Sequence, residues 1–205
     1  MQTRDPDVRL MLAFRDGDES ALADLYRSWA GPLLRYLERM VHERPLAEEI
    51  LQEAFIRVYG ARERYVPEAR FSTWLFRIGR NLALNELDRA HRRRPHLPAS
   101  GTDVRDWDGD GSGRPTLSLV SDRPSPLSSA IARETSQRLE AALAELPERQ
   151  RSALWLATVE GRSYGEIAGI LDTTIPSVKS LVHRARSTLA ERMDAAGAGT
   201  QEVRR

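Results

Sequence analysis

The stretch from Ala47 to Tyr59 carries apolar residues three and four positions apart, the period of an α-helix, and this pattern constrains the fold more than any other feature. Similar patterns predict helices over residues 19–40 and 72–91, with a kink or break at Pro32. No run alternates between apolar and polar residues for long enough to predict a strand. The sequence therefore predicts an all-α fold.

Between residues 95 and 130 the helical pattern fails. Pro, Gly, Ser and Asp dominate this segment, and its few apolar residues have no period. Such a composition buries too little apolar surface to offset the entropy that is lost on ordering. We therefore expect two small helical domains, at residues 1–94 and 131–194, joined by a flexible acidic linker over residues 95–130. We expect a disordered tail at residues 195–205.

The expected linker contains the sequence DWDGDGSG, in which Asp106, Asp108, Asp110 and Gly111 are spaced as at the start of an EF-hand calcium loop. The twelfth position of that loop is Leu117, where a calcium site needs a bidentate glutamate. No helices are predicted on either side to hold the loop. We therefore expect no calcium site here and interpret the stretch as the centre of the linker.

The C-terminal part of the chain predicts a helix-turn-helix unit. Ser163 and Glu166 have the spacing of a capping box at the start of a short helix, and a longer helix follows near Pro176. The outward face of the longer helix carries hydrogen-bond donors and no acid: Ser177, Lys179, Ser180, His183, Arg184 and Ser187. Such a face suits the phosphates and base edges of a DNA major groove. The alternative is a helix-packing motif whose basic face is merely solvated.

Charge is distributed unevenly, although the net charge is only +1. Residues 1–61 hold eight arginines and eleven acids, whereas residues 62–94 hold nine arginines and four acids. The basic segment interleaves arginines with aromatic residues such as Tyr65, Phe71 and Trp74. That mixture suits the phosphates and unstacked bases of single-stranded nucleic acid. Burial of the aromatic rings in a core is an equally good interpretation.

The helix at Ala47 to Tyr59 has an acidic strip opposite its apolar face, formed by Glu48, Glu49, Gln52 and Glu53. Such strips are usually only the wet face of a helix. DNA would repel this one, so a partner that binds it would be a basic protein surface.

Signals for catalysis are weak. The four histidines are scattered without the spacing of metal ligands, no glycine loop of the phosphate-binding kind precedes a helix, and the chain has no cysteine. We expect neither an enzyme nor a cofactor. The N-terminus lacks the apolar run of a signal peptide and no stretch is long enough for a membrane span, so we expect a soluble, cytoplasmic protein.

Three motifs, in this order, resemble those of bacterial RNA polymerase sigma factors of the extracytoplasmic-function type, within the sigma-70 family. They are AEEILQEAFIRVY, then FSTWLFRIGRNLALNELDRAHRRR, then a stretch that runs from LPERQRSALWLATVEGRSYGEIAGIL to SVKSLVHRARSTL. The resemblance implies two helical domains joined by a flexible linker. It also implies a factor that directs core RNA polymerase to promoters by −10 and −35 recognition and helps to melt the −10 region.

The resemblance further assigns roles to individual positions. The residues expected to bind core polymerase are Glu49, Gln52 and Glu53. Those expected to bind the −10 element and its separated non-template strand are Arg64, Arg70, Arg77, Arg80, Asn81 and Asn85. Those expected to bind the −35 duplex are Ser177, Lys179, Ser180, His183 and Arg184. Asp172 departs from the family pattern because glycine usually holds this turn position, but aspartate tolerates a left-handed backbone better than most residues.

The partners that follow from the resemblance are core RNA polymerase and promoter DNA, both duplex and single-stranded. Family members are commonly held inactive by an anti-sigma factor, which is a further candidate partner. Two other functions stay open at this point. One is a helix-turn-helix regulator that binds duplex DNA without polymerase, and the other is a helical protein-interaction module.

Overall fold

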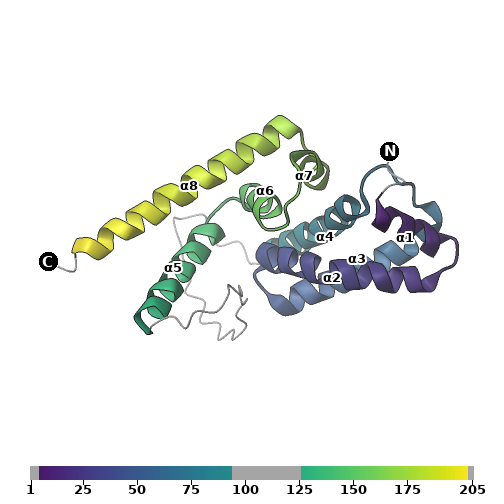
Figure 1. Cartoon of the computed structure of the whole chain (residues 1–205), viewed down its shortest axis with the longest axis horizontal. Helices are drawn as coiled ribbons and strands as arrows, with labels where there is room; N and C mark the ends of the chain where they lie inside the picture. The colour runs from purple at the N-terminus through teal and green to yellow at the C-terminus, as the bar shows by residue number, and fades with distance from the viewer. Residues whose placement is uncertain (1–4, 94–125, 203–205) are drawn as a thin grey trace.

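The computed structural model describes residues 5–93 and 126–202, and every regular element in them is helical. The N-terminal domain consists of α1 (Pro6–Arg15), α2 (Glu19–Val41), α3 (Arg44–Gly60), the short 3-10 helix η2 (Arg62–Arg64) and α4 (Phe71–Arg93). The C-terminal domain consists of α5 (Pro126–Ala144), α6 (Glu148–Thr158), α7 (Tyr164–Leu171) and α8 (Ile175–Glu202) (Figure 1). The prediction of an all-α fold is confirmed.

Two helices extend beyond the ranges that the sequence predicts for them. Helix α5 begins at Pro126, inside the segment expected to be linker, and α8 continues to Glu202, into the expected tail. Proline is favoured in the first turn of a helix, and the end of α8 is rich in alanine, the residue with the highest helix propensity. The rest of the expected linker, DWDGDGSG included, lies outside the described residues.

Helix α2 runs through Pro32 without a break, where the sequence predicted a kink or a division. Its apolar face, with Leu25, Leu33 and Leu37, is fully buried, and this packing offsets the backbone hydrogen bond that proline removes. Gly79 of α4 faces the same helix. A Cβ atom there would lie 2.9 Å from a methyl carbon of Leu33, so the two helices approach closely only because residue 79 is glycine.

The sequence analysis did not predict α1. The helix starts at an N-cap, Asp5, whose side chain accepts a hydrogen bond from the backbone N–H of Asp7, and it buries Val8, Met11 and Phe14. The signal was present as an aspartate–proline start followed by apolar residues three positions apart. The stretch was missed because only three turns carry the pattern.

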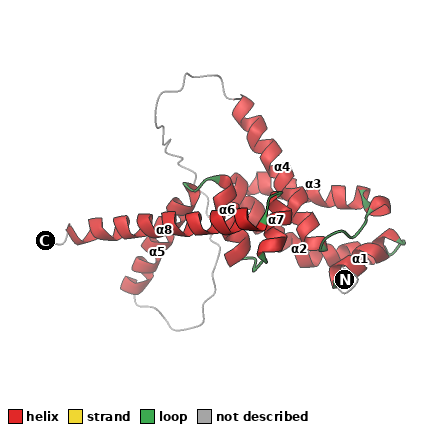
Figure 2. Cartoon of the chain, turned by 90° about the horizontal axis from the view of Figure 1, so that it is seen from above, coloured by secondary structure: helices red, strands yellow, loops and turns green. Residues whose placement is uncertain are grey.

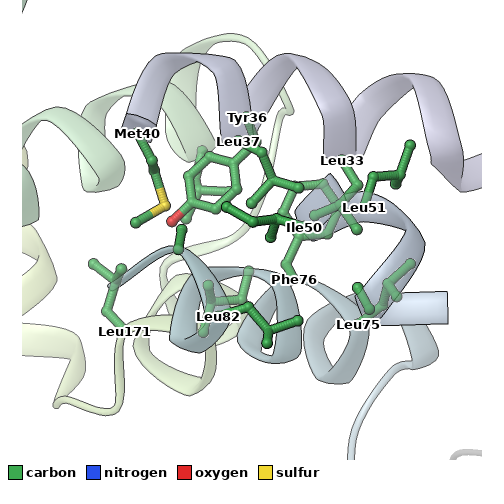
Figure 3. Close-up of a cluster of buried hydrophobic side chains, with 14 of the residues drawn as sticks. Leu33, Tyr36, Leu37, Met40, Ile50, Leu51, Leu75, Phe76, Leu82 and Leu171 are labelled. Carbon is green, nitrogen blue, oxygen red and sulfur yellow. The ribbon is translucent and has the colours of Figure 1, made fainter. Parts of the chain in front are cut away.

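The two domains share one hydrophobic core. Figure 3 shows Met40 of α2, Leu82 of α4 and Leu171 of α7 in a single cluster of buried side chains around Tyr36. Helix α7 packs on α4 and α6 packs on α2, whereas α8 extends away from the N-terminal domain (Figure 2). In the described part of the chain, no helix is both long and apolar enough to cross a membrane.

Candidate nucleic-acid interface

The outward side of α8 is open to solvent, and the residues predicted there from sequence are found on it. Val178, Val182 and Ala185 turn inward and are buried, which fixes the rotation of the helix. Ser177 is half-buried, and the side chains that are exposed are Lys179, Ser180, His183 and Arg184. These five residues form what we call the recognition face. In the described part of the chain none of them forms a salt bridge. The cations Lys179 and Arg184 can therefore bind an anion.

Helix α7 and the turn after it hold α8 in place. Ser163 and Glu166 form the predicted capping box: Glu166 N–H donates to Ser163 Oγ at 3.3 Å, and Ser163 N–H donates to Glu166 Oε2 at 3.0 Å. Asp172 then adopts the left-handed conformation with φ 49°, as its place in the turn required. Helix α8 starts three residues later. The helix-turn-helix prediction is therefore confirmed.

Helix α4 presents a second polar face. Arg77, Asn81 and Asn85 follow one another at single-turn intervals, and all three are exposed. We call these three residues the α4 stripe. Arg64, at the end of η2, is also exposed.

The aromatic residues of the basic segment are mainly structural. Phe71 is fully buried, Tyr65 is 6% exposed and Trp74 is half-buried between them, with ring centroids 5.9 Å from Phe71 and 5.1 Å from Tyr65. Of the two interpretations that the sequence left open, core packing is correct for Phe71 and Tyr65. Base recognition by this segment therefore depends on its polar side chains.

The acidic strip lies on the solvent-exposed side of α3. Glu49 has no salt-bridge partner among the described residues and Gln52 is uncharged, whereas Glu53 pairs with Arg57 at 2.9 Å and Glu48 with Arg44 at 2.9 Å. A groove of about 370 Å³ separates this strip from α4. Side chains from both helices line the groove, among them Glu49, Glu53, Asn85 and Arg89. The residues expected to meet polymerase therefore lie next to one end of the α4 stripe.

Two of the arginines expected to bind the −10 element, Arg70 and Arg80, contact the C-terminal domain. Arg80 is 7% exposed, and its Nε and Nη2 atoms donate to the two carboxylate oxygens of Glu148 at 3.3 and 3.0 Å. Arg70 lies 3.3 Å from Glu166 and remains largely exposed. Two further pairs cross between the domains, Arg35 with Glu160 and Arg39 with Glu140, each at 3.6 Å. We call these four pairs the interdomain contact.

The Arg80–Glu148 pair belongs to a partly buried chain of hydrogen bonds. Ser152 Oγ donates to Glu148 Oε1 at 2.9 Å, and Tyr36 Oη lies 3.2 Å from Ser152 Oγ. Burial raises the pKa of Tyr36 far above its ordinary value, so the phenol stays protonated and can donate. A buried carboxylate needs several donors to offset its lost hydration, and Arg80 and Ser152 supply three.

Arg162 crosses the interface in the opposite direction. Its guanidinium carbon lies 4.7 Å from the ring centroid of Trp29 and 5.0 Å from that of Phe76, and its Nη1 donates to Ser72 Oγ at 2.8 Å. Burial lowers the pKa of Arg162, and Glu166 opposes the shift. The side chain is only 9% exposed. An arginine of the C-terminal domain thus fills an aromatic slot in the N-terminal one.

Sequence reasoning missed the residues that join the domains, notably Glu148, Glu160, Arg162 and Glu166. Glu148 and Glu166 look like ordinary first-turn acids of helices, and Arg162 looks like an ordinary surface cation. Nothing local marks their long-range partners. In the ranges 5–93 and 126–202 no cluster of side chains is arranged to hold a metal ion.

Comparison with known proteins identifies the family of this chain. The family model for sigma-70 region 2 matches residues 25–93, and the model for sigma-70 region 4 matches residues 136–189. The RNA polymerase sigma-H factor of Pseudomonas aeruginosa is 31% identical over 189 residues, which are 92% of this chain and 94% of that protein. The chain belongs to the sigma-70 family. It is an RNA polymerase sigma factor of the extracytoplasmic-function type, as the sequence motifs predicted.

Other comparisons agree on both family and fold. The sigma factor is 28% identical to the ECF RNA polymerase sigma factor SigW of Bacillus subtilis over 183 residues. These residues cover 87% of this chain and 92% of SigW. Two solved structures share its fold. CnrH, in complex with the cytosolic domain of CnrY, gives a TM-score of 0.64 at 21% identity, covering 92% of this chain and 97% of that one. RpoE of Bartonella quintana, in complex with the anti-sigma factor NepR, gives 0.61 at 20% identity, covering 84% and 96%.

Membership of this family makes the sigma factor a transcription initiation factor, which binds RNA polymerase and promoter DNA.

Proposed function

We propose that this sigma factor recognises the −35 element through α8 and the −10 element through α4, and helps to melt the −10 region. The observation that carries the proposal is the presence of two separate polar faces on one chain. One is the recognition face on a helix-turn-helix, and the other is the α4 stripe beside the acidic strip of α3.

The recognition face suits a major groove because α8 is long, exposed on one side and free of acids there. Arg184 can form a bidentate pair with a guanine edge, and Lys179 can reach a phosphate. Ser180 and His183 can donate to either. Phosphate contacts would fix the register of the helix, and base contacts would give sequence preference.

The α4 stripe suits unpaired bases. Asn81 and Asn85 each carry a donor and an acceptor on one amide, which matches the edge of an adenine. Arg64, Arg70, Arg77 and Arg80 are the proposed phosphate ligands of this segment. Unpairing a few base pairs costs some kcal/mol, and capture of bases and phosphates on α4 would offset that cost. No covalent chemistry is required of the chain.

The acidic strip of α3 is the proposed contact for core polymerase, through Glu49, Gln52 and Glu53. A basic surface on polymerase would complement it, whereas DNA would be repelled. We retain the division into a polymerase and −10 domain at residues 1–94 and a −35 domain at residues 131–194, to which α5 adds the residues from Pro126. Because CnrH and RpoE are seen with CnrY and the anti-sigma factor NepR, an anti-sigma factor is a further proposed partner.

The proposal is tested by mixing the purified chain with core polymerase and assaying transcription from a library of genomic fragments. Transcription that starts at a common pair of upstream elements is the expected result. A chain that fails to bind core would rule out the proposal. Duplex binding with no core binding would favour the helix-turn-helix regulator.

Reversal of charge on the acidic strip tests its assignment separately. Glu53→Lys should weaken core binding and leave binding of duplex DNA by α8 intact. Glu134→Lys makes the same charge change on the exposed side of α5 and serves as the control. Equal core affinity for the two variants would contradict the assignment.

A further inference from the structure

Nothing in the proposed function involves helix α1. The helix precedes residues 25–93, which the sigma-70 region 2 model matches, and the residues proposed to bind DNA or polymerase all lie outside it. It lies at the end of the N-terminal domain opposite α5 (Figure 1). Helix α1 packs on α2 and α4, as the core of the domain requires, but it also packs on η2, where the connection that carries Arg64 begins.

This connection, residues 61–70 between α3 and α4, depends on side chains for its position. Arg64 N–H donates to Ala61 O at 3.0 Å, and Tyr65 N–H donates to Arg62 O at 3.4 Å. Both bonds close short turns within the connection, and such turns do not hold a surface segment against the rest of a domain. Around Arg64, the side chains that are not exposed are those of Arg62 and Tyr65, and α1 lies beside both.

The C-terminal end of α1 holds Arg62. The guanidinium carbon of Arg62 lies 5.8 Å from the ring centroid of Phe14 and 5.0 Å from that of Tyr59, and its Nη1 donates to Tyr59 Oη at 3.3 Å. The two rings are in contact, with centroids 5.6 Å apart, and Phe14 is only 1% exposed. A planar guanidinium is attracted to the face of an aromatic ring, so this pair of rings forms a fixed seat for Arg62.

The N-terminal end of α1 faces Tyr65. This residue is 6% exposed, and its ring centroid lies 5.1 Å from that of Trp74. Burial raises the pKa of Tyr65 to about 12, and the nearby carboxylates of Asp5 and Asp7 add to the shift. The Tyr65 hydroxyl has no hydrogen-bond partner among the described residues. Packing of the ring, rather than a hydrogen bond, therefore holds Tyr65 in place.

We infer that α1 is a positioning element for −10 binding: by holding Arg62 and Tyr65, it fixes where Arg64 meets the separated strand. Arg64 is exposed and lies between the two held residues. A side chain that is already placed loses less conformational entropy on binding. The inference rests on the proposed role of Arg64 at the −10 element. Phe14, Arg62 and Tyr65 act through Arg64 and need no contact with DNA of their own.

Phe14→Leu tests the inference from the side of α1. The change removes the ring against which Arg62 lies and keeps an apolar side chain in the core. Phe55→Leu is the matched control, because it makes the same change at another buried ring, 8% exposed, which packs on Tyr26 with centroids 4.8 Å apart. In the described part of the chain, no cation lies over the Phe55 ring.

The measurement is a double-mutant cycle on the complete sigma factor. Each variant is combined with Arg64→Ala, and every protein is reconstituted with core polymerase. The probe is a fluorescent single-stranded oligonucleotide with the non-template −10 sequence of a promoter selected from the genomic library. The cycle isolates the dependence of Arg64 on α1, since a general loss of affinity cancels. Thermal unfolding of each free chain shows that it is folded.

Arg64→Ala should lower the affinity for the strand about tenfold in the wild type and in Phe55→Leu, because one charged hydrogen bond is lost. In Phe14→Leu the same change should lower it about threefold or less, because Arg64 is no longer held in place. Tyr59→Leu removes the other ring and the oxygen that accepts from Arg62, at a position that is 48% exposed. It should act like Phe14→Leu and replaces that variant if it fails to fold.

The possible outcomes separate the inference from the proposed function. Equal losses on Arg64→Ala in all backgrounds would overturn the inference, leave α1 as part of the core, and leave the proposed function standing. No loss on Arg64→Ala in the wild type would remove Arg64 from the −10 set, and the inference with it. A chain without core-dependent transcription would remove both the proposed function and the inference.

Discussion

The recognition face of α8 and the basic segment of α4 have similar sequences, but they differ in whether their cations are paired with acids in the folded chain. Both are helical, cationic and predicted to bind DNA. The cations of the recognition face, Lys179 and Arg184, have no salt bridge among the described residues. Arg80 of α4 is buried against Glu148, and Arg70, directly before α4, reaches Glu166. Whether a basic segment is available to nucleic acid therefore depends on tertiary contacts as much as on its own charge.

The largest expected effect comes from removing Arg162, which fills the slot between Trp29 and Phe76. Arg162→Ala should weaken docking by about 3 kcal/mol, since a desolvated cation–π contact and a charged hydrogen bond are lost together. Because the protein has no cysteine, Ser28→Cys on α2 and Ser187→Cys on α8 accept a pair of dyes, and a urea titration of energy transfer between them measures the loss. This change should weaken the contact between α4 and the C-terminal domain, and should leave duplex binding by the recognition face unaltered.

Arg186→Ala is the control for that variant, because Arg186 is exposed on α8 and forms no salt bridge among the described residues. It should leave the urea midpoint of energy transfer within error of the wild type. If both variants shifted the midpoint equally, the slot would not be what holds the domains together.

Next in size is the effect of Arg184→Ala on the recognition face. The change should weaken binding to a −35 duplex by about 1–3 kcal/mol if Arg184 makes a good base contact. The measurement compares the selected promoter with a scrambled duplex in the full chain. Equal losses on both sequences would show that Arg184 contacts phosphate. A change in interdomain energy transfer would show that the two faces are not independent.

A smaller effect is expected from acid, through Glu166. Burial opposes ionisation of this carboxyl, but hydrogen bonds with Ser163 and the nearby Arg70 and Arg162 lower its pKa below the ordinary value of 4.5. The unfolded chain therefore takes up the proton first as the pH falls. The stabilisation is complete above the ordinary pKa and is lost as the pH falls through the lowered one.

Glu166→Gln should remove that part of the pH dependence and cost about 1 kcal/mol at neutral pH, the usual contribution of a capping interaction. Urea unfolding of both proteins between pH 3 and pH 7 is the measurement. Parallel stability curves for the two proteins would contradict a role for the ionised carboxylate.

The smallest effect is expected in the turn before α8. Asp172→Gly should stabilise the chain by about 0.5–1 kcal/mol, because glycine adopts the left-handed conformation at φ 49° without a steric penalty. Thermal unfolding measures the gain, and duplex affinity should not change. Weaker duplex binding would show that the aspartate sets the angle at which the recognition face is presented.

The parts of this molecule that the sequence predicts are those encoded locally. The helical period of α3, the capping box at Ser163 and the left-handed turn at Asp172 all depend on residues within a few positions of one another. The orientation of α8 also follows from its own pattern, because Val178 and Val182 can point only inward. These features made the recognition face predictable residue by residue.

The rest depends on contacts between distant residues, which no local pattern records. The pairing of Arg80 with Glu148 joins positions 68 residues apart. The continuity of α2 through Pro32 depends on apolar packing against other helices. The roles of individual α3 and α4 residues in polymerase and −10 binding were inferred from family resemblance. The residues alone are as consistent with a solvent-exposed helix face as with a binding surface.

The segregation of charge in the interdomain contact has a consequence for how a released C-terminal domain would move. Its glutamates at positions 140, 148 and 160 would lose their arginine partners on one side, and Glu166 would keep only Arg162, while Lys179 and Arg184 lie on another helix. Such a domain is an electric dipole as a whole. The negative potential of a duplex would orient the domain as it diffuses towards DNA, so that α8 faces the duplex and the acidic side faces away. Separation would thus supply an orienting torque.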